Sequence, residues 1–440
     1  MCGINIIKLL NNTIENINYH CAMRGPDKTN IRKINDITFI HNLLQITGET
    51  TLQPFVDENI VCLYNGEIYN YKSFNSEYTS DGQCLIPLYE KYGHNFVKYL
   101  DGEFAIVLFD FERNVFIMST DVFSTKPLFY SFYNDNLMIS SYKTCIETNY
   151  MSNIHKLDAN TTVAFSIDTC ELLHKQTVFS FNLVQYKTTY EDWCDAFDNA
   201  IRKRTDTTKP YFVSLSSGYD SGLICASLNK FGKTYKTYSV LGQENPDVLK
   251  NRIMLNKQQY GFYRINSETA DKYKNIIRQK CSDFVSKVRK TNPRKIYSVQ
   301  NDRASLGGAF IYERARNDGY RIGLSGQGAD EIISDYGWNG QKQSWHSCFG
   351  GKFPTDLSKI FPWESFYSGI GQCLLMKEEI IGGSYGIELR YPFLDKNVVQ
   401  EFLWLHPDLK NKIYKAPIDY YFNKQKYPYA REKVGFNCLY

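Results

Sequence analysis

The 440-residue chain lacks any apolar run long enough to span a bilayer, and its N-terminus lacks the apolar core of a secretory signal peptide. Its twelve cysteines form no Cys-x-x-Cys pair, which excludes a small disulfide scaffold and argues against a zinc site. A net charge of +4 is too small to indicate nucleic acid as a partner. Internal repeats and low-complexity tracts are also missing. We therefore expect a cytoplasmic globular protein with reduced thiols.

The pattern of apolar residues changes near residue 185. Before it, short apolar or alternating segments such as 4–9 and 104–109 predict antiparallel strands, with one helix over residues 84–100. After it, strand-like segments such as 211–215 and 320–324 alternate with helical stretches, which predicts a parallel α/β sheet. The sequence therefore predicts two domains, over residues 1–185 and 186–440.

The opening Met1-Cys2-Gly3 suggests an N-terminal nucleophile. Methionine is readily removed when the next side chain is small, and its removal would place a thiol and a free α-amine on Cys2. Such a residue carries its own general base, because the amine can take the thiol proton directly or through a water. The alternative is a cysteine that follows the start codon by chance.

The most specific signal is a small-residue loop between a strand and a helix, Leu-Ser-Ser-Gly-Tyr-Asp-Ser at residues 215–221. Backbone amides and hydroxyls at such a turn form an anion-binding nest. Gly218 permits close approach of a phosphate, and Asp220 could hold Mg²⁺ beside it. The Gly-Lys-Ser/Thr of a Walker loop is missing. An ordinary helix-capping turn is the alternative.

Two later segments, residues 324–331 and 385–395, follow this loop in an order and spacing that resemble the synthetase domain of asparagine synthetases. The resemblance implies an ATP-pyrophosphatase fold (adenine nucleotide alpha hydrolase-like) that uses ATP and Mg²⁺. It implies that Asp220 and Asp330 hold Mg²⁺, that Gln327 lies on the acceptor side, and that Lys433 approaches the acyl-adenylate. The residues implied around ATP are Leu215, Ser216, Ser217, Gly218, Asp220, Ser221, Val240 and Gly326.

Residues 65–71, Asn-Gly-Glu-Ile-Tyr-Asn-Tyr, resemble a motif of class II glutamine amidotransferases, and Arg24-Gly25-Pro26-Asp27 also fits that family. The resemblance implies a four-layer αββα Ntn-hydrolase fold with Cys2 as nucleophile. Asn65 and Gly66 would then form the oxyanion hole, and Glu67 and Asp81 would bind glutamine. A tight hairpin turn is the alternative for Asn-Gly.

Two of the residues that depart from these family patterns bear on the binding of substrates. Leu43 stands where relatives carry an arginine that grips the glutamine carboxylate, and a leucine cannot do so. We therefore expect glutaminase activity with a raised KM. Gln327 replaces a glutamate of asparagine synthetases, which removes a carboxylate that could help deprotonate the incoming amine.

Together the motifs imply glutamine-dependent, ATP-consuming amidation of a carboxylate through an acyl-adenylate, with aspartate as the leading acceptor. Two alternatives stay open: amidation of another carboxylate, such as a sugar acid or modified peptide, and a non-catalytic nucleotide-binding relative with a decayed glutaminase. We expect glutamine, ATP and the acceptor as partners, no nucleic acid or membrane, and a homodimer as the candidate assembly.

Overall fold

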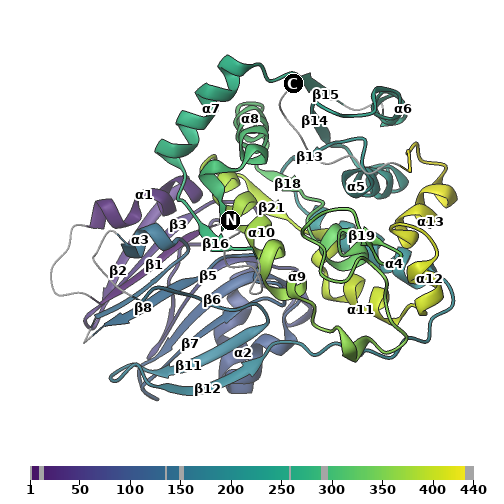
Figure 1. Ribbon diagram of the computed structural model, residues 1–440. Helices are drawn as coiled ribbons and strands as arrows, with labels where there is room; N and C mark the ends of the chain where they lie inside the picture. Colours follow the sequence, from purple (N-terminus) through teal and green to yellow (C-terminus); the bar gives the residue numbers. More distant parts are fainter. Residues whose placement is uncertain are drawn as a thin grey trace. The chain divides into compact units, whose positions relative to one another are not determined.

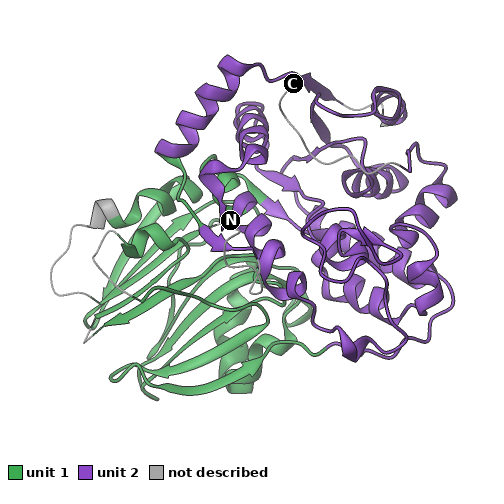
Figure 2. Cartoon of the chain, in the orientation of Figure 1, with its two compact units in different colours: residues 1–180, 280–284, 379–388 green, residues 181–279, 285–378, 389–440 purple. Residues whose placement is uncertain are grey.

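The computed structural model of the chain describes residues 2–8, 14–133, 136–147, 153–256, 259–288 and 296–431 (Figure 1). Met1 and Lys433 lie outside these residues. The chain divides into two compact units, shown in green and purple in Figure 2. Unit 1 comprises Met1–Ser180, Lys280–Phe284 and Glu379–Glu388, and unit 2 comprises the rest. Because unit 1 includes two later segments of the chain, the units do not divide the sequence at one point, and the domain boundary at residue 185 stays a prediction.

Unit 1 contains two six-stranded sheets, whose described strand pairs are antiparallel. The strand orders are β10-β8-β9-β1-β3-β2 and β12-β11-β7-β6-β5-β4. The strands are β1 (Gly3–Lys8), β2 (Lys28–Ile34), β3 (Ile37–Leu43), β4 (Phe55–Asp57), β5 (Ile60–Ile68), β6 (Gly102–Asp110), β7 (Val115–Thr120), β8 (Phe129–Tyr133), β9 (Asn136–Ser140), β10 (His155–Lys156), β11 (Thr161–Ser166) and β12 (Leu172–Thr177).

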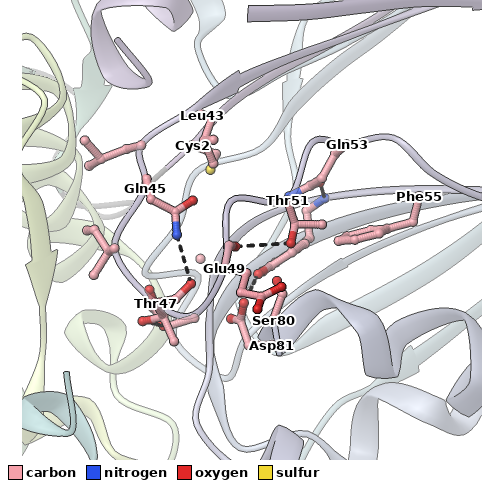
Figure 3. Close-up of a pocket in the computed structure, with 15 residues that line it drawn as sticks. Cys2, Leu43, Gln45, Thr47, Glu49, Thr51, Gln53, Phe55, Ser80 and Asp81 are labelled. Carbon is pink, nitrogen blue, oxygen red and sulfur yellow. Dashed lines mark hydrogen bonds between the residues drawn. The ribbon is translucent and has the colours of Figure 1, made fainter. Parts of the chain in front are cut away.

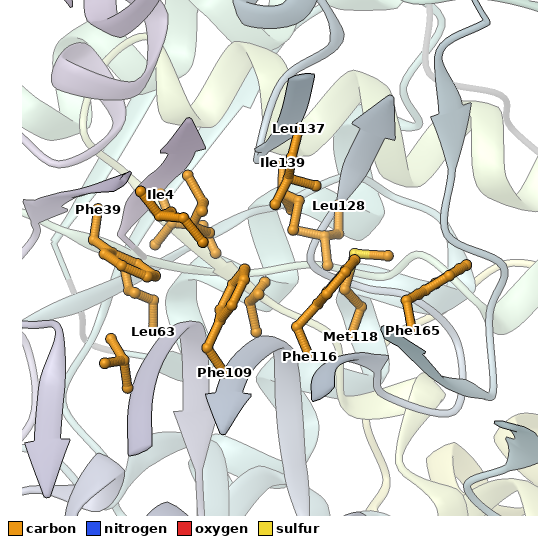
Figure 4. Packing of buried hydrophobic residues seen from close by; sticks show 14 of the residues in the cluster. Ile4, Phe39, Leu63, Phe109, Phe116, Met118, Leu128, Leu137, Ile139 and Phe165 are labelled. Atoms are coloured by element: carbon orange, nitrogen blue, oxygen red, sulfur yellow. The ribbon is translucent and has the colours of Figure 1, made fainter. Parts of the chain in front are cut away.

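The two sheets pack face to face around an apolar core (Figure 4). Ile4 of β1 and Phe39 of β3 meet Leu63 of β5 and Phe109 of β6 there. Because side chains alternate along a strand, the next residues of β6 point to the other face and pack with the helix α2 (Leu85–Tyr92). Burial on both faces explains why β6 is a continuous apolar run.

Helices cover the outer face of each sheet. The helix α1 (Ile14–Arg24) contacts β1 and β3 as well as α3 (Lys143–Glu147), while α2 lies on the second sheet. The expected four-layer αββα arrangement is therefore confirmed. The single helix expected over residues 84–100 is wrong. α2 ends at Tyr92, because the next residue, Gly93, has a φ of 55° that closes the helix, and a 3₁₀ segment (Gly93–Tyr99) follows.

Unit 2 is built around a five-stranded sheet in the order β15-β14-β13-β18-β21. The pairs formed by β13, β14, β15 and β18 are parallel, so the expected parallel α/β sheet is confirmed. Its strands are β13 (Tyr211–Ser214), β14 (Lys236–Val240), β15 (Tyr260–Tyr263), β18 (Ile322–Leu324) and β21 (Glu388–Arg390).

The remaining elements connect and cover these strands. Two small hairpins pair β16 (Val285–Lys287) with β17 (Ile296–Ser298) and β19 (Gly337–Trp338) with β20 (Gln341–Lys342). The helices are α4 (Glu191–Thr205), α5 (Tyr219–Lys230), α6 (Pro246–Asn256), α7 (Ser267–Lys280), α8 (Arg303–Asn317), α9 (Glu364–Tyr367), α10 (Gly369–Gly383), α11 (Lys396–Trp404), α12 (Pro407–Asn411) and α13 (Ala416–Gln425).

The strand order of unit 2 reverses between β13 and β18. The chain runs outward from β13 through β14 to β15, then returns to place β18 on the other side of β13. In open α/β sheets, ligands bind outside the carboxyl ends of the strands at such a switch point. The loops after β13 and β18 are the two glycine-containing loops of the sequence, so the topology brings them to one place.

Two properties of the whole chain follow from the described residues. None of the helices described is long and apolar enough to cross a membrane. Every cysteine within the described ranges is a free thiol.

Replacing Phe109 by alanine should lower the free energy of unfolding of unit 1 by about 3–5 kcal/mol, because this fully buried ring fills the space between the sheets. Urea unfolding followed by near-UV circular dichroism measures the change. The matched control is Tyr133→Ala on β8, whose side chain is 55% exposed and whose loss should cost less than about 0.5 kcal/mol. Equal effects of the two changes would contradict the described core.

Candidate functional site

Cys2 is held at the start of β1 by Asn65 of β5. The backbone N–H of Cys2 donates to Asn65 Oδ1 at 2.9 Å. Asn65 is fully buried, and its Nδ2 has no hydrogen-bond partner among the residues that the structure describes. Leaving a buried donor unpaired costs about 1–3 kcal/mol. An unpaired donor beside a thiol is what the stabilisation of an oxyanion requires.

The neighbouring Gly66 is a position that only glycine can occupy. Its φ is +143°, and a Cβ added there would lie 1.9 Å from the carbonyl oxygen of Glu103. The close approach of β5 to β6 at this point therefore depends on the missing side chain.

The thiol of Cys2 is 8% exposed. Burial raises its pKa above the usual value, and the charge of the N-terminus and a hydrogen bond from the Leu44 backbone lower it to a smaller extent. The resting thiol is therefore protonated at neutral pH, and it needs a base nearby before it can react as a thiolate.

A buried ion cluster holds the backbone of Cys2 in place. Arg24 Nε donates to the Cys2 carbonyl oxygen at 2.9 Å, and the same guanidinium pairs with Glu379. Lys126 Nζ lies 3.0 Å from Glu379 Oε1 and 3.5 Å from Glu103 Oε2. All four charged side chains are at most 3% exposed. The predicted Arg24 motif thus positions the backbone of Cys2.

A pocket of about 380 Å³, measured out to open solvent, lies next to Cys2 (Figure 3). Asp81 lies in its wall, where it accepts hydrogen bonds from Tyr64 and from Ile68 N at 2.9 Å. Glu67 accepts from Thr47 Oγ1 at 2.8 Å. The lining residues are Cys2, Leu43, Leu44, Gln45, Ile46, Thr47, Glu49, Thr51, Gln53, Phe55, Tyr64, Gly66, Glu67, Ser80 and Asp81. The structure therefore brings Cys2, Gly66, Glu67 and Asp81 to one pocket.

In unit 2, the loop after β13 forms a network of small polar groups. Ser216 N donates to Ser221 Oγ at 3.0 Å, and Gly218 N donates to Ser216 Oγ at 3.1 Å. The fully buried Arg252 donates to the carbonyl oxygens of Ser216 and Gly218, at 2.6 and 2.8 Å. These contacts fix the loop where α5 begins.

The carboxylate of Glu244 shows that this loop holds an anion. Its Oε2 accepts hydrogen bonds from both the backbone N–H and the hydroxyl of Ser217. A carboxylate oxygen in this position makes the contacts that a phosphate oxygen would make. The sequence had given no reason to single out Glu244.

The second glycine loop lies against the first. A Cβ added at Gly326 would lie 2.7 Å from Asp220 Cβ, so the backbones approach closely there. Leu215 and Val240, expected near the adenosine, are both buried; Leu215 directly follows β13, and Val240 is the last residue of β14. The residues predicted to surround ATP are thus assembled from neighbouring strands of one sheet.

Lys415 joins the two predicted metal ligands. Its Nζ lies 2.5 Å from Asp220 Oδ1 and 2.9 Å from Asp330 Oδ1, and Tyr414 OH donates to the same oxygen of Asp330 at 2.9 Å. Burial alone would lower the pKa of Lys415, but the two carboxylates outweigh it and raise the pKa well above the usual value. Sequence reasoning missed this cation, because only the fold brings residue 415 beside residue 220.

The donor set at this point fits Mg²⁺, which proteins usually bind through one or two carboxylates together with substrate phosphates. Asp220 and Asp330 both aim an oxygen at one positive group, which shows that the two carboxylates converge. In the described part of the chain, no cluster of three or more His, Cys, Asp or Glu side chains forms a complete metal site. A phosphate-bearing ligand would therefore have to complete the coordination.

Gln327, which is predicted to lie on the acceptor side, has a carboxylate partner. Its Nε2 donates to Glu378 Oε1 of α10 at 3.3 Å. A carboxylate is therefore present beside the position where the sequence shows an amide in place of glutamate. Its partner comes from a distant segment, so local sequence carried no signal for it.

Comparison with known proteins agrees with the two units. Residues 1–184 match the model of a glutamine amidotransferase domain, and residues 192–371 match that of asparagine synthase. The chain therefore joins a glutamine amidotransferase domain to an asparagine synthase domain. These matches and its curated relatives indicate a glutamine-dependent amide ligase that uses ATP.

Curated relatives include the mouse asparagine synthetase (glutamine-hydrolyzing), 25% identical over 88% of this chain and 74% of the relative. A second relative is asparagine synthetase (glutamine-hydrolyzing) 2 of Oryza sativa subsp. japonica, 24% identical over 93% of this chain and 70% of the relative. The solved glutamine phosphoribosylpyrophosphate amidotransferase of B. subtilis overlaps 53% of this chain and 65% of its own, with 11% identity and a TM-score of 0.33. That structural likeness is too weak to carry an argument.

Replacing Lys415 by methionine should lower the free energy of unfolding by about 1–3 kcal/mol at pH 7.5, because two carboxylates are left facing each other. Protonation of either carboxylate relieves this repulsion, so the deficit should shrink as the pH falls to 5. In the wild type, the contribution of Lys415 is constant over this range, since it is lost only when the pH rises above about 10.4.

Urea unfolding at the two pH values measures this deficit. The matched control is Lys424→Met, which breaks an exposed pair with Glu191 and should cost less than about 1 kcal/mol at either pH. A deficit for Lys415→Met that grows on acidification would contradict the described contact.

Proposed function

We propose that the chain transfers the amide nitrogen of glutamine to the side-chain carboxylate of aspartate, with release of asparagine, glutamate, AMP and pyrophosphate. The observation that carries the proposal is the contact of Cys2, which lines a pocket with acidic groups, with Asn65, whose amide donor is unpaired within the described residues. Glutamine and ATP are its substrates, and Mg²⁺ its metal.

In the glutaminase half, removal of Met1 exposes the α-amine of Cys2. Asn65 Oδ1 holds this nitrogen and so directs its lone pair toward the thiol, whose proton it takes. The sulfur then bonds to the amide carbon of glutamine, and the carbon–nitrogen bond breaks as ammonia leaves with that proton. Water cleaves the resulting thioester and releases glutamate.

The other residues of this pocket bind and stabilise the substrate. Asn65 Nδ2 and the backbone N–H of Gly66 donate to the oxyanion that forms on the amide oxygen. Asp81 and Glu67 attract the α-ammonium group of glutamine. Asp81 retains acceptor capacity, since a carboxylate can accept about four hydrogen bonds.

In the synthetase half, Ser216, Ser217, Gly218 and Ser221 bind the pyrophosphate part of ATP after Glu244 leaves the loop. An oxygen of the acceptor carboxylate bonds to the α-phosphorus and pyrophosphate departs. Ammonia then attacks the acyl carbon, loses a proton, and AMP departs. Lys415 neutralises charge on the departing pyrophosphate, and Lys433, outside the described residues, is proposed to contact the acyl-adenylate. Asp220 and Asp330 would hold Mg²⁺, which supplies positive charge beside the phosphates.

A different acceptor carboxylate is the second candidate, and Gln327 favours it. Asparagine synthetases have glutamate at this position, whereas here an amide is engaged by Glu378. The change alters the hydrogen-bonding groups presented to the acceptor.

The proposed protein has two domains, over residues 1–185 and 186–440, and acts as a homodimer in the cytoplasm.

The nucleophile is tested by two variants. Cys2→Ala should abolish ammonia release from glutamine while synthesis from added ammonium continues. Asn65→Asp keeps an acceptor for Cys2 N but removes the donor, so kcat for glutamine hydrolysis should fall by about 10²–10³. A loss of less than tenfold in Asn65→Asp would remove Asn65 from the oxyanion hole, and glutamine hydrolysis by Cys2→Ala would remove Cys2 as nucleophile.

The acceptor is tested by release of pyrophosphate from MgATP and ammonium in the presence of one carboxylate at a time. Aspartate should give pyrophosphate, AMP and asparagine in equal amounts, and Gln327→Glu should raise this rate. Turnover only with another carboxylate, such as a sugar acid, would replace aspartate by that acceptor. No pyrophosphate with any acceptor would leave a nucleotide-binding protein without ligase activity.

A further inference from the structure

We propose that the pocket beside Cys2 is built for a glutamine whose α-amine is free and whose α-carboxyl group is uncharged, as in an amino-terminal glutaminyl amide. Free glutamine is then the poorer nitrogen donor. The inference rests on the proposed glutaminase chemistry of Cys2 and specifies the substrate class of that site.

The side chains that line the pocket make it acidic. Three of its fifteen lining residues are carboxylates, Glu49, Glu67 and Asp81, and none of the fifteen is a lysine, arginine or histidine (Figure 3). Glu67 and Asp81 are buried, at 7% and 4% exposure. A pocket with this charge attracts an ammonium group and repels a carboxylate. Free glutamine carries both groups on the same carbon atom.

The basic residues around this site are already paired, are neutral, or lie outside the pocket. Arg24 is paired with Glu379 and with the Cys2 carbonyl, so its charge is already balanced. His41 of β3 is opposite Ile4 in the β1–β3 pairing. Burial lowers the pKa of His41 to about 3, which keeps its side chain neutral. Lys28 is opposite Leu43 in the β2–β3 pairing, but it is exposed and does not line the pocket. A substrate carboxylate therefore meets no counter-ion in the pocket wall.

Part of the pocket wall is apolar. Leu43, Leu44 and Ile46 follow one another closely in the chain, line the pocket, and are all buried. An ester or amide group can lie against these side chains at little desolvation cost, whereas a carboxylate would lose its hydration there without gaining a partner. The lining thus provides acidic groups for the α-amine and an apolar surface for an uncharged carboxyl group.

The preference is measured by ammonia release from L-glutamine and from its α-N-methylamide, in which only the side-chain amide can give ammonia. The wild-type protein should show a kcat/KM at least about tenfold higher for the N-methylamide, because this substrate brings no negative charge into the pocket. The difference should lie in KM, since the atoms that react with Cys2 are the same in both substrates.

Two variants separate the causes. Leu43→Arg places a cation in the pocket wall and should reverse the preference in favour of free glutamine. Lys28→Ala, the matched control, should leave the ratio of the two kcat/KM values unchanged.

The outcomes are distinct. Equal or better use of free glutamine by the wild type would overturn the inference and leave the glutaminase in place. A selective loss of glutamine activity in Lys28→Ala would also overturn it, by showing that Lys28 binds the carboxylate. Failure to release ammonia from either substrate would overturn the proposed glutaminase and the inference with it.

Discussion

The fold of unit 1 and the position of Cys2 depend on one buried ion cluster. Arg24 binds the Cys2 carbonyl and pairs with Glu379, and Lys126 balances Glu379 and Glu103. Transfer of four charges from water is costly unless each is paired, so removal of one member would leave the others uncompensated. Arg24 and Glu379 lie 355 residues apart in the chain. Unit 1 is therefore complete only when Glu379–Glu388 has joined it.

Unit 2 relies on a similar balance at the two glycine loops that are proposed to bind phosphate. Lys415 compensates Asp220 and Asp330, and Ser217 is occupied by the carboxylate of Glu244. In the proposed function, both contacts stand where charged parts of MgATP would bind, so the described state pairs the proposed ligand-binding groups with other groups of the chain. Binding of the nucleotide then exchanges one set of charge contacts for another, which keeps the cost of assembling a highly charged site low.

Local sequence predicted the elements and loops, and the fold supplied the partners. Apolar alternation and the strand–loop–helix pattern depend on near neighbours, so the sheets and the loop at residues 215–221 were predictable. Lys415, Glu378 and Glu379 act through contacts with residues far away in the chain, and no short motif encodes such contacts. The end of α2 at Tyr92, just before Gly93, was missed because the apolar spacing continues past it.

The central claim is that this chain moves nitrogen from glutamine to a carboxylate at the expense of ATP. The direct test incubates the protein with [amide-¹⁵N]glutamine, MgATP and aspartate, and follows the products by mass spectrometry. The account predicts ¹⁵N-labelled asparagine with one AMP formed per label transferred, and no labelled product with Cys2→Ala. Labelled ammonia without a labelled amide from any acceptor tried, together with unconsumed ATP, would contradict it.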